Sequence, residues 1–154
     1  MSTEASQAEP EKAPERGRRW LWACVAVYAA GILVATSVPI PPGLPAPENS
    51  DKLVHLLMYA GLSALFSRAL FAKPTVREQR RRVAALCILT TFICCCLFGA
   101  FDEWHQQFVG RNTSFADWVA DAIGVMLGAV CMVWYLLRDR RAWRRNLHVR
   151  SKAD

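Results

Sequence analysis

The sequence predicts an all-α, polytopic membrane protein in which four transmembrane helices form a compact bundle. Its 154 residues are 53% hydrophobic and only 21% charged, a composition that argues against a disordered chain. The apolar residues fall into four blocks, each about as long as the roughly 20 helical residues that cross a hydrocarbon core. The blocks are residues 20–38, 53–72, 83–101 and 116–137. A soluble bundle would need a charged face on each helix, whereas residues 83–101 contain no charged residue.

The first block, residues 20–38, is predicted to be a retained anchor and not a cleavable signal peptide. Its apolar run exceeds the roughly 7 to 15 residues of a signal sequence, and Cys24 lies near the start of the run instead of behind it. The preceding residues 1–19 are rich in Glu, Pro, Ala and Ser and contain no aromatic residue. We therefore expect a disordered cytoplasmic tail at 1–19, followed by one transmembrane domain at 20–137. Residues 39–50, with five prolines, are expected to form an extended strap to the second block.

Lys and Arg residues orient the chain, because they are retained on the cytoplasmic side of a membrane. Of the 19 such residues, only Lys52 and Arg111 lie in or beside the first and third connections. The others precede the first block, surround the second connection, or follow the fourth block in a basic tail at 138–154. Both termini are therefore expected to be cytoplasmic. This topology and the attraction to anionic membrane lipids explain the net charge of +6, so no nucleic-acid partner is expected.

Polar residues gather where the second block begins, the third ends and the fourth begins, all on the predicted outer side. Residues three or four apart share one face of a helix, and each of these three segments contains such a group. The groups are Asp51, His55 and Tyr59; Glu103, Gln106 and Gln107, with Asp102 and His105 beside them; and Asp117 and Asp121.

Members of these groups also have ordinary structural explanations. Ser114 with Asp117 fits a helix capping box, and His55 taken alone suits a packed, hydrogen-bonded histidine. Asp121 is the strongest functional candidate, because it lies one turn inside Asp117 and a lipid-facing carboxylate costs several kcal/mol. We expect Asp121 to face the bundle, either protonated or paired with His55 or Arg111.

Small residues in the apolar blocks have packing roles. Gly124 and Gly128 form a G-x-x-x-G step that permits another helix to approach closely. We expect the step to serve packing within the chain, with a homodimer as the alternative. All six cysteines lie inside apolar blocks, where thiols pack as small hydrophobes, and their spacing indicates neither disulfides nor a metal site.

At these polar residues the chain resembles the VanZ-like family of small bacterial membrane proteins. Three motifs occur in the family's order: Asp-Lys with a downstream His and Tyr, Glu-x-x-Gln-x-Phe followed by Gly-Arg, and an Asp followed by a polar residue and glycines. The matching residues are Asp51, Lys52, His55, Tyr59, Glu103, Gln106, Phe108, Gly110, Arg111, Asp117, Asp121, Gly124 and Gly128. Two positions depart from the pattern. Val109 replaces a proline, and Asp121 replaces an asparagine, which adds a negative charge to the site.

The resemblance implies a multi-pass protein of the bacterial cytoplasmic membrane with a role in the cell envelope. The family's namesake is linked to resistance to teicoplanin-type glycopeptide antibiotics, which places that role at the outer face of the membrane. Asp102 and His105 are not among the matched positions, so we expect them to flank the site.

Our first hypothesis is that the chain binds a lipid-linked or glycopeptide-like ligand at the headgroup level. Lys52, His55 and Arg111 would meet phosphate or carboxylate, and the acidic and amide side chains would bond sugar or amide groups. The ligand-binding residues under this hypothesis are Asp51, Lys52, His55, Tyr59, Glu103, Gln106, Arg111, Asp117 and Asp121.

A second hypothesis is an enzyme, a hydrolase or transferase acting on a lipid-linked envelope precursor. Glu103 or Asp117 would be the general base, His55 an acid or base, and Arg111 would stabilise developing negative charge. The sequence leaves open whether the protein is an enzyme.

A metal-dependent form of the enzyme would use His55 and His105 with Asp51 or Glu103. The chain lacks a metal-binding motif, so we expect neither a metal nor another cofactor. In a third hypothesis the polar residues form only an interhelical network that fixes the bundle.

Overall fold

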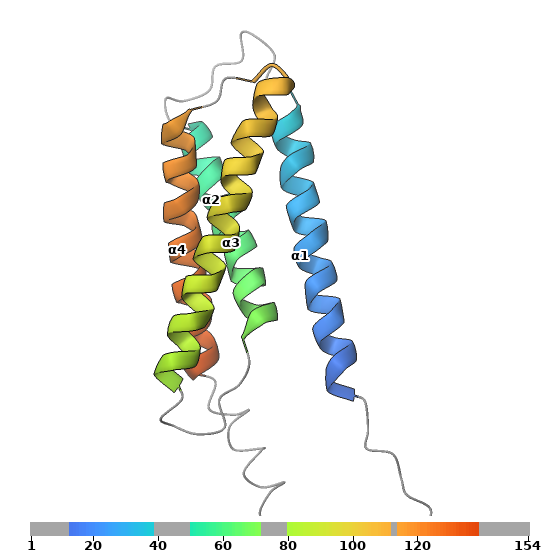
Figure 1. The fold of residues 1–154 in the computed structure, drawn as a ribbon, viewed down its shortest axis with the longest axis vertical. Helices are drawn as coiled ribbons and strands as arrows, with labels where there is room; N and C mark the ends of the chain where they lie inside the picture. Colours follow the sequence, from blue (N-terminus) through green and yellow to red (C-terminus); the bar gives the residue numbers. More distant parts are fainter. Residues whose placement is uncertain (1–12, 39–49, 72–79, 112–113, 139–154) are drawn as a thin grey trace, which may run out of the picture.

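The computed structural model describes residues 13–38, 50–71, 80–111 and 114–138, and these residues form four α-helices (Figure 1). The helices are α1 (Ala13–Ser37), α2 (Ser50–Leu70), α3 (Arg80–Phe108) and α4 (Phe115–Arg138). The described residues contain no β-strand, and each helix is long and apolar enough to cross a membrane. The predicted all-α membrane bundle is therefore confirmed.

Two helices, α1 and α3, extend seven residues beyond one end of their apolar blocks. α1 begins at Ala13, inside the segment expected to be disordered, while the predictions for 1–12, the strap at 39–49 and the tail after Arg138 lie outside the described residues. α3 runs seven residues past Phe101 to Phe108, since no Gly or Pro interrupts this segment. Two residues after its end comes Gly110, whose φ of 74° is the left-handed conformation typical of helix ends.

α2 and α4 form the most extensive helix contact in the bundle. The contact is close because Gly124 and Gly128 face the backbone of α2. A Cβ atom at Gly124 would collide with the carbonyl oxygen of Leu56, and one at Gly128 with that of Ala60. The G-x-x-x-G step therefore packs within the chain, as expected, and these two glycines are covered and not free to contact a second copy.

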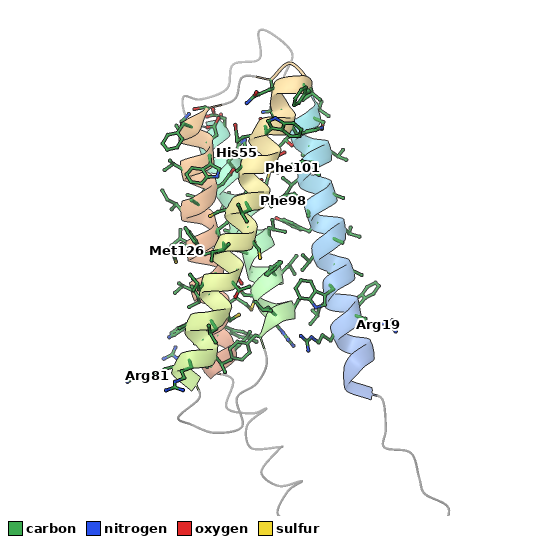
Figure 2. The ribbon with its side chains drawn as sticks, viewed as in Figure 1. Arg19, His55, Arg81, Phe98, Phe101 and Met126 are labelled. Carbon is green, nitrogen blue, oxygen red and sulfur yellow. The ribbon has the colours of Figure 1, made fainter. Side chains whose placement is uncertain are left out.

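The two ends of the bundle differ in charge. Figure 2 places Arg19 and Arg81 at one end and His55 with Phe101 toward the other. Arg68 and Arg138, in the last turns of α2 and α4, also belong to the basic end. Large apolar side chains are exposed on all four helices between the ends, as a lipid-facing surface requires.

Candidate functional site

Buried polar side chains concentrate at the end of the bundle where α1 and α3 finish and α2 and α4 begin (Figure 1). The sequence predicted contributions from three of these helices. The structure adds the fourth, because Thr36 of α1 is also buried there. The buried polar residues of this end are Thr36, His55, Asp102, Gln106, Asp117 and Asp121.

Asp102 is the centre of a closed hydrogen-bond network. It is 0% exposed, and its Oδ1 atom accepts a bond of 2.7 Å from the Thr36 hydroxyl. Its Oδ2 atom accepts bonds from the Tyr59 hydroxyl at 3.3 Å and from Nε2 of Gln106 at 3.2 Å. These bonds join α1, α2 and α3, and they satisfy both oxygens of the carboxylate.

The expectation that Asp102 only flanks the site is therefore corrected. Tyr59 and Gln106, which we also predict to bind ligand, donate hydrogen bonds to Asp102. The sequence carried a signal for this role: Asp102 follows an uncharged run of 19 residues directly and lies four residues before Gln106, so it shares a helix face with an amide donor.

His55 and Asp121 form a buried pair between α2 and α4. Nδ1 of His55 lies 3.0 Å from Oδ1 of Asp121, and Asp121 is 1% exposed. Asp121 thus faces the bundle as expected, and its partner is His55. The other carboxylate oxygen, Oδ2, has no hydrogen-bond partner. It approaches α3 at Gly99, where an added Cβ would lie 3.4 Å from it.

Glu103 of α3 lies close to the pair of His55 and Asp121. Its Oε2 atom accepts a hydrogen bond from the backbone N–H of Ser114 at 3.3 Å, while its Oε1 atom is buried without a partner. His55, Glu103 and Asp121 each offer one ligand atom, and the three atoms lie within 4.8 Å of one another. We call these three residues the acidic triad. His105 is not a member, and its ring stacks on Phe101.

Lys52 lies at the rim of the site with two carboxylates. Its Nζ atom is 3.4 Å from Oδ2 of Asp51 and 3.6 Å from Oδ1 of Asp117. Asp117 does not complete the predicted capping box. Ser114 caps α4 by accepting the N–H of Ala116 at 3.2 Å, but its own N–H is bonded to Glu103 and not to Asp117.

Arg111 makes its side-chain hydrogen bond to α1 and not to the acidic triad. Its Nη1 atom donates a hydrogen bond of 3.2 Å to the backbone carbonyl of Thr36, in the last turn of α1. A cation at the carbonyl end of a helix is a stabilising arrangement. Of the two cations expected to pair with Asp121, His55 is therefore the partner, and the contact of Arg111 with an anionic ligand stays a prediction.

An open groove of about 380 Å³ lies beside the acidic triad, between α3 and α4. Trp118 is fixed in its wall by a hydrogen bond of 3.3 Å from Nε1 to the carbonyl of Cys96. Glu103 belongs to both the groove and the triad, so the groove adjoins the triad at this residue. The residues that line the groove are Ala100, Glu103, Trp104, Gln107, Ser114, Phe115 and Trp118.

Comparison with known protein families gives one informative match. Residues 18–138 match the family described as VanZ/LLP1, a range that includes the acidic triad, the groove and the network around Asp102. Comparison with curated proteins gives no match, and neither does comparison with solved structures.

Proposed function

The chain belongs to the VanZ/LLP1 family, and on this premise we propose that it binds the polar head of a lipid-linked or glycopeptide-like cell-envelope ligand in the groove beside the acidic triad. Pockets of this kind combine aromatic walls with a few converging polar groups. Here Trp104, Phe115 and Trp118 supply the walls, and Glu103, Gln107 and Ser114 supply the polar groups.

One observation carries the proposal: some carboxylates at this end of the bundle have hydrogen-bond partners on both oxygens, whereas others have a buried oxygen without a partner. Asp102 has hydrogen-bond partners on both oxygens, as a purely structural residue should. By contrast, Glu103 and Asp121 each have one buried oxygen without a hydrogen-bond partner, and Oδ1 of Asp117 has only the ammonium group of Lys52 at 3.6 Å. A network that served only to fix the bundle would leave few such atoms, so these oxygens favour a bound ligand.

The charges of the site favour a ligand that donates hydrogen bonds. Glu103, Asp117 and Asp121 are acceptors, while Arg111 is engaged with α1. Sugar hydroxyls, peptide amides and amino groups suit such acceptors better than a bare phosphate or carboxylate does. We therefore revise the ligand chemistry expected from the sequence toward the sugar and peptide part of an envelope precursor, with Lys52 as the cation at the rim.

The proposal also implies on which side of the membrane the groove opens. We place the groove at the outer face of the bacterial cytoplasmic membrane, since the opposite end of the bundle is the basic end. There the protein would act in cell-envelope maintenance or in tolerance to glycopeptide antibiotics.

A matched pair of tryptophans tests the groove. Trp104 lines it and is 55% exposed, whereas Trp134 is 56% exposed near the basic end of α4. The full chain in lipid nanodiscs is titrated with a fluorescent, isoprenyl-linked disaccharide-pentapeptide. We expect Trp104→Ala to weaken binding at least about tenfold and Trp134→Ala to change it less than about twofold. Equal effects of the two substitutions, or no saturable binding by the wild type, would overturn the proposal.

A second candidate function, an enzyme acting on the same ligand, is favoured by the pair of His55 and Asp121. A histidine oriented by a carboxylate is the usual arrangement of a general base, and Glu103 is close enough to share a reacting group. The test is mass spectrometry of the lipid-linked ligand after incubation with excess protein. A product formed by the wild type and lost in His55→Asn supports an enzyme, whereas an unchanged ligand supports binding alone.

A further inference from the structure

We infer that His55, Glu103 and Asp121 bind a divalent metal cation of the zinc type between α2, α3 and α4. The three residues come from three different helices and present their ligand atoms within 4.8 Å of one another. No metal-binding motif marks these residues, because motifs depend on ligands close together in one segment, whereas these positions are separated by 48 and 18 residues.

The donor set suits zinc or manganese. Imidazole nitrogen and carboxylate oxygen are both ligands that Zn²⁺ accepts, and a zinc site with three protein ligands leaves a fourth position open. Ligand atoms around a tetrahedral zinc ion lie roughly 3.4 Å apart, given bond lengths of about 2.1 Å. Nδ1 of His55 and Oδ1 of Asp121, at 3.0 Å, are already this close, and the ligand atom of Glu103 lies within 4.8 Å of the other two. Closing the site therefore requires Glu103 to approach, and the metal replaces the hydrogen bond between His55 and Asp121.

Unpartnered oxygens provide an independent reason to expect a cation. Oε1 of Glu103 and Oδ2 of Asp121 are both buried and accept no hydrogen bond. Asp121 is 1% exposed, so solvent does not satisfy its oxygen. A buried acceptor without a donor costs free energy, and a metal cation removes that cost for carboxylate oxygens.

The excess of carboxylates at this end of the bundle also favours a bound cation. Asp102, Glu103, Asp117 and Asp121 lie together at this end, where Lys52 contacts Asp117 and His55 contacts Asp121. Arg111 bonds to a backbone carbonyl, so it does not neutralise any of these carboxylates directly. A divalent cation at the triad would offset the charges of Glu103 and Asp121 at a depth where uncompensated charge is costly.

Neighbouring groups hold the proposed ligands in place. The N–H of Ser114 fixes Oε2 of Glu103 at 3.3 Å and leaves Oε1 free. Gly99 of α3 lies beside the carboxylate of Asp121, since an added Cβ there would be in van der Waals contact with Oδ2 at 3.4 Å and tight against the ring of Tyr59 at 3.3 Å. Such supporting contacts orient ligands in metal sites. Because Glu103 also lines the groove, the open coordination position would be reached from there. The inference does not depend on which organic ligand the groove binds.

Direct titration tests the site. The full chain in nanodiscs is treated with a chelator, its thiols are alkylated to remove zinc-binding cysteines, and Zn²⁺ is added in a calorimeter. We expect one equivalent to bind, with affinity falling at least about a hundredfold in Glu103→Gln and in Asp121→Asn. His105→Gln is the matched control, because His105 lies two residues from Glu103 but outside the triad, and we expect it to bind as the wild type does. Equal affinity in all variants would overturn the inference.

A second measurement uses the wild type alone, in case a triad variant folds poorly. Co²⁺ replaces Zn²⁺, and the absorption spectrum reports the donor atoms. We expect a saturable spectrum of nitrogen and oxygen coordination without a sulfur-to-cobalt charge-transfer band, together with a higher melting temperature in the presence of metal. No saturable binding, or a spectrum of thiolate coordination only, would overturn the inference.

Discussion

Asp102 and Asp121 are both fully buried carboxylates, but their hydrogen bonding differs. Asp102 receives three donors from three helices, and Asp121 receives one histidine while its second oxygen stays unpartnered. Sequence spacing predicted the inward orientation of Asp121 correctly. It could not separate the two roles, because the donors to Asp102 include Thr36, which lies 66 residues away on α1 and carries no distinguishing pattern of its own.

Asp102 should therefore matter for stability more than Glu103 does. Asp102→Ala leaves the donors of Thr36, Tyr59 and Gln106 without their acceptor, so we expect the free energy of unfolding to fall by roughly 2 to 3 kcal/mol. Reversible unfolding in mixed detergent micelles, in the presence of a chelator, measures the change. Glu103→Ala is the control: it removes a carboxylate with one free buried oxygen, and stability should fall by less than about 1 kcal/mol. A larger loss in Glu103→Ala than in Asp102→Ala would contradict this division of roles.

At the scale of elements, composition predicted where helices lie better than where they end. The apolar blocks identified all four helices, but α3 continues through the polar segment after Phe101 to Phe108. Hydropathy indicates which residues of a helix lie inside the membrane. The end of the helix depends on backbone conformation, here the positive φ of Gly110. The groove was also beyond prediction, because its wall combines side chains of α3 and α4 whose separation depends on helix packing.

The contact between α2 and α4 should be the least tolerant of added volume. Gly128→Ala places a methyl group against the backbone of Ala60, so we expect the unfolding free energy to fall by about 2 kcal/mol or more. Gly31→Ala is a matched control on α1, since a Cβ there has no neighbour within 4 Å. That variant should keep or slightly gain stability, by up to about 1 kcal/mol from helix propensity. Similar losses in both variants would show that the glycine step is not the tight contact.

Helix packing determines how the four helices are arranged, whereas the distribution of charge determines how the bundle is oriented in the membrane. The helix contacts fix how the four helices meet, but they do not determine which end faces the cytoplasm, since a bundle can insert in either direction. Charge provides that information: Arg19, Arg68, Arg81 and Arg138 lie at one end, and the acidic triad lies toward the other. The sequence anticipated this separation because it depends only on the order of apolar and basic segments along the chain.

We therefore expect the groove to open on the outer side and both termini to be cytoplasmic. Two single substitutions at exposed helix ends test this: Asp51→Cys beside the site and Arg138→Cys at the basic end. In intact bacterial cells, a membrane-impermeant maleimide should label Asp51→Cys, whereas Arg138→Cys should react only after permeabilisation. The unsubstituted chain measures the background from the six native cysteines. The opposite labelling pattern would place the groove on the cytoplasmic side, where a ligand displayed on the outer leaflet could not reach it.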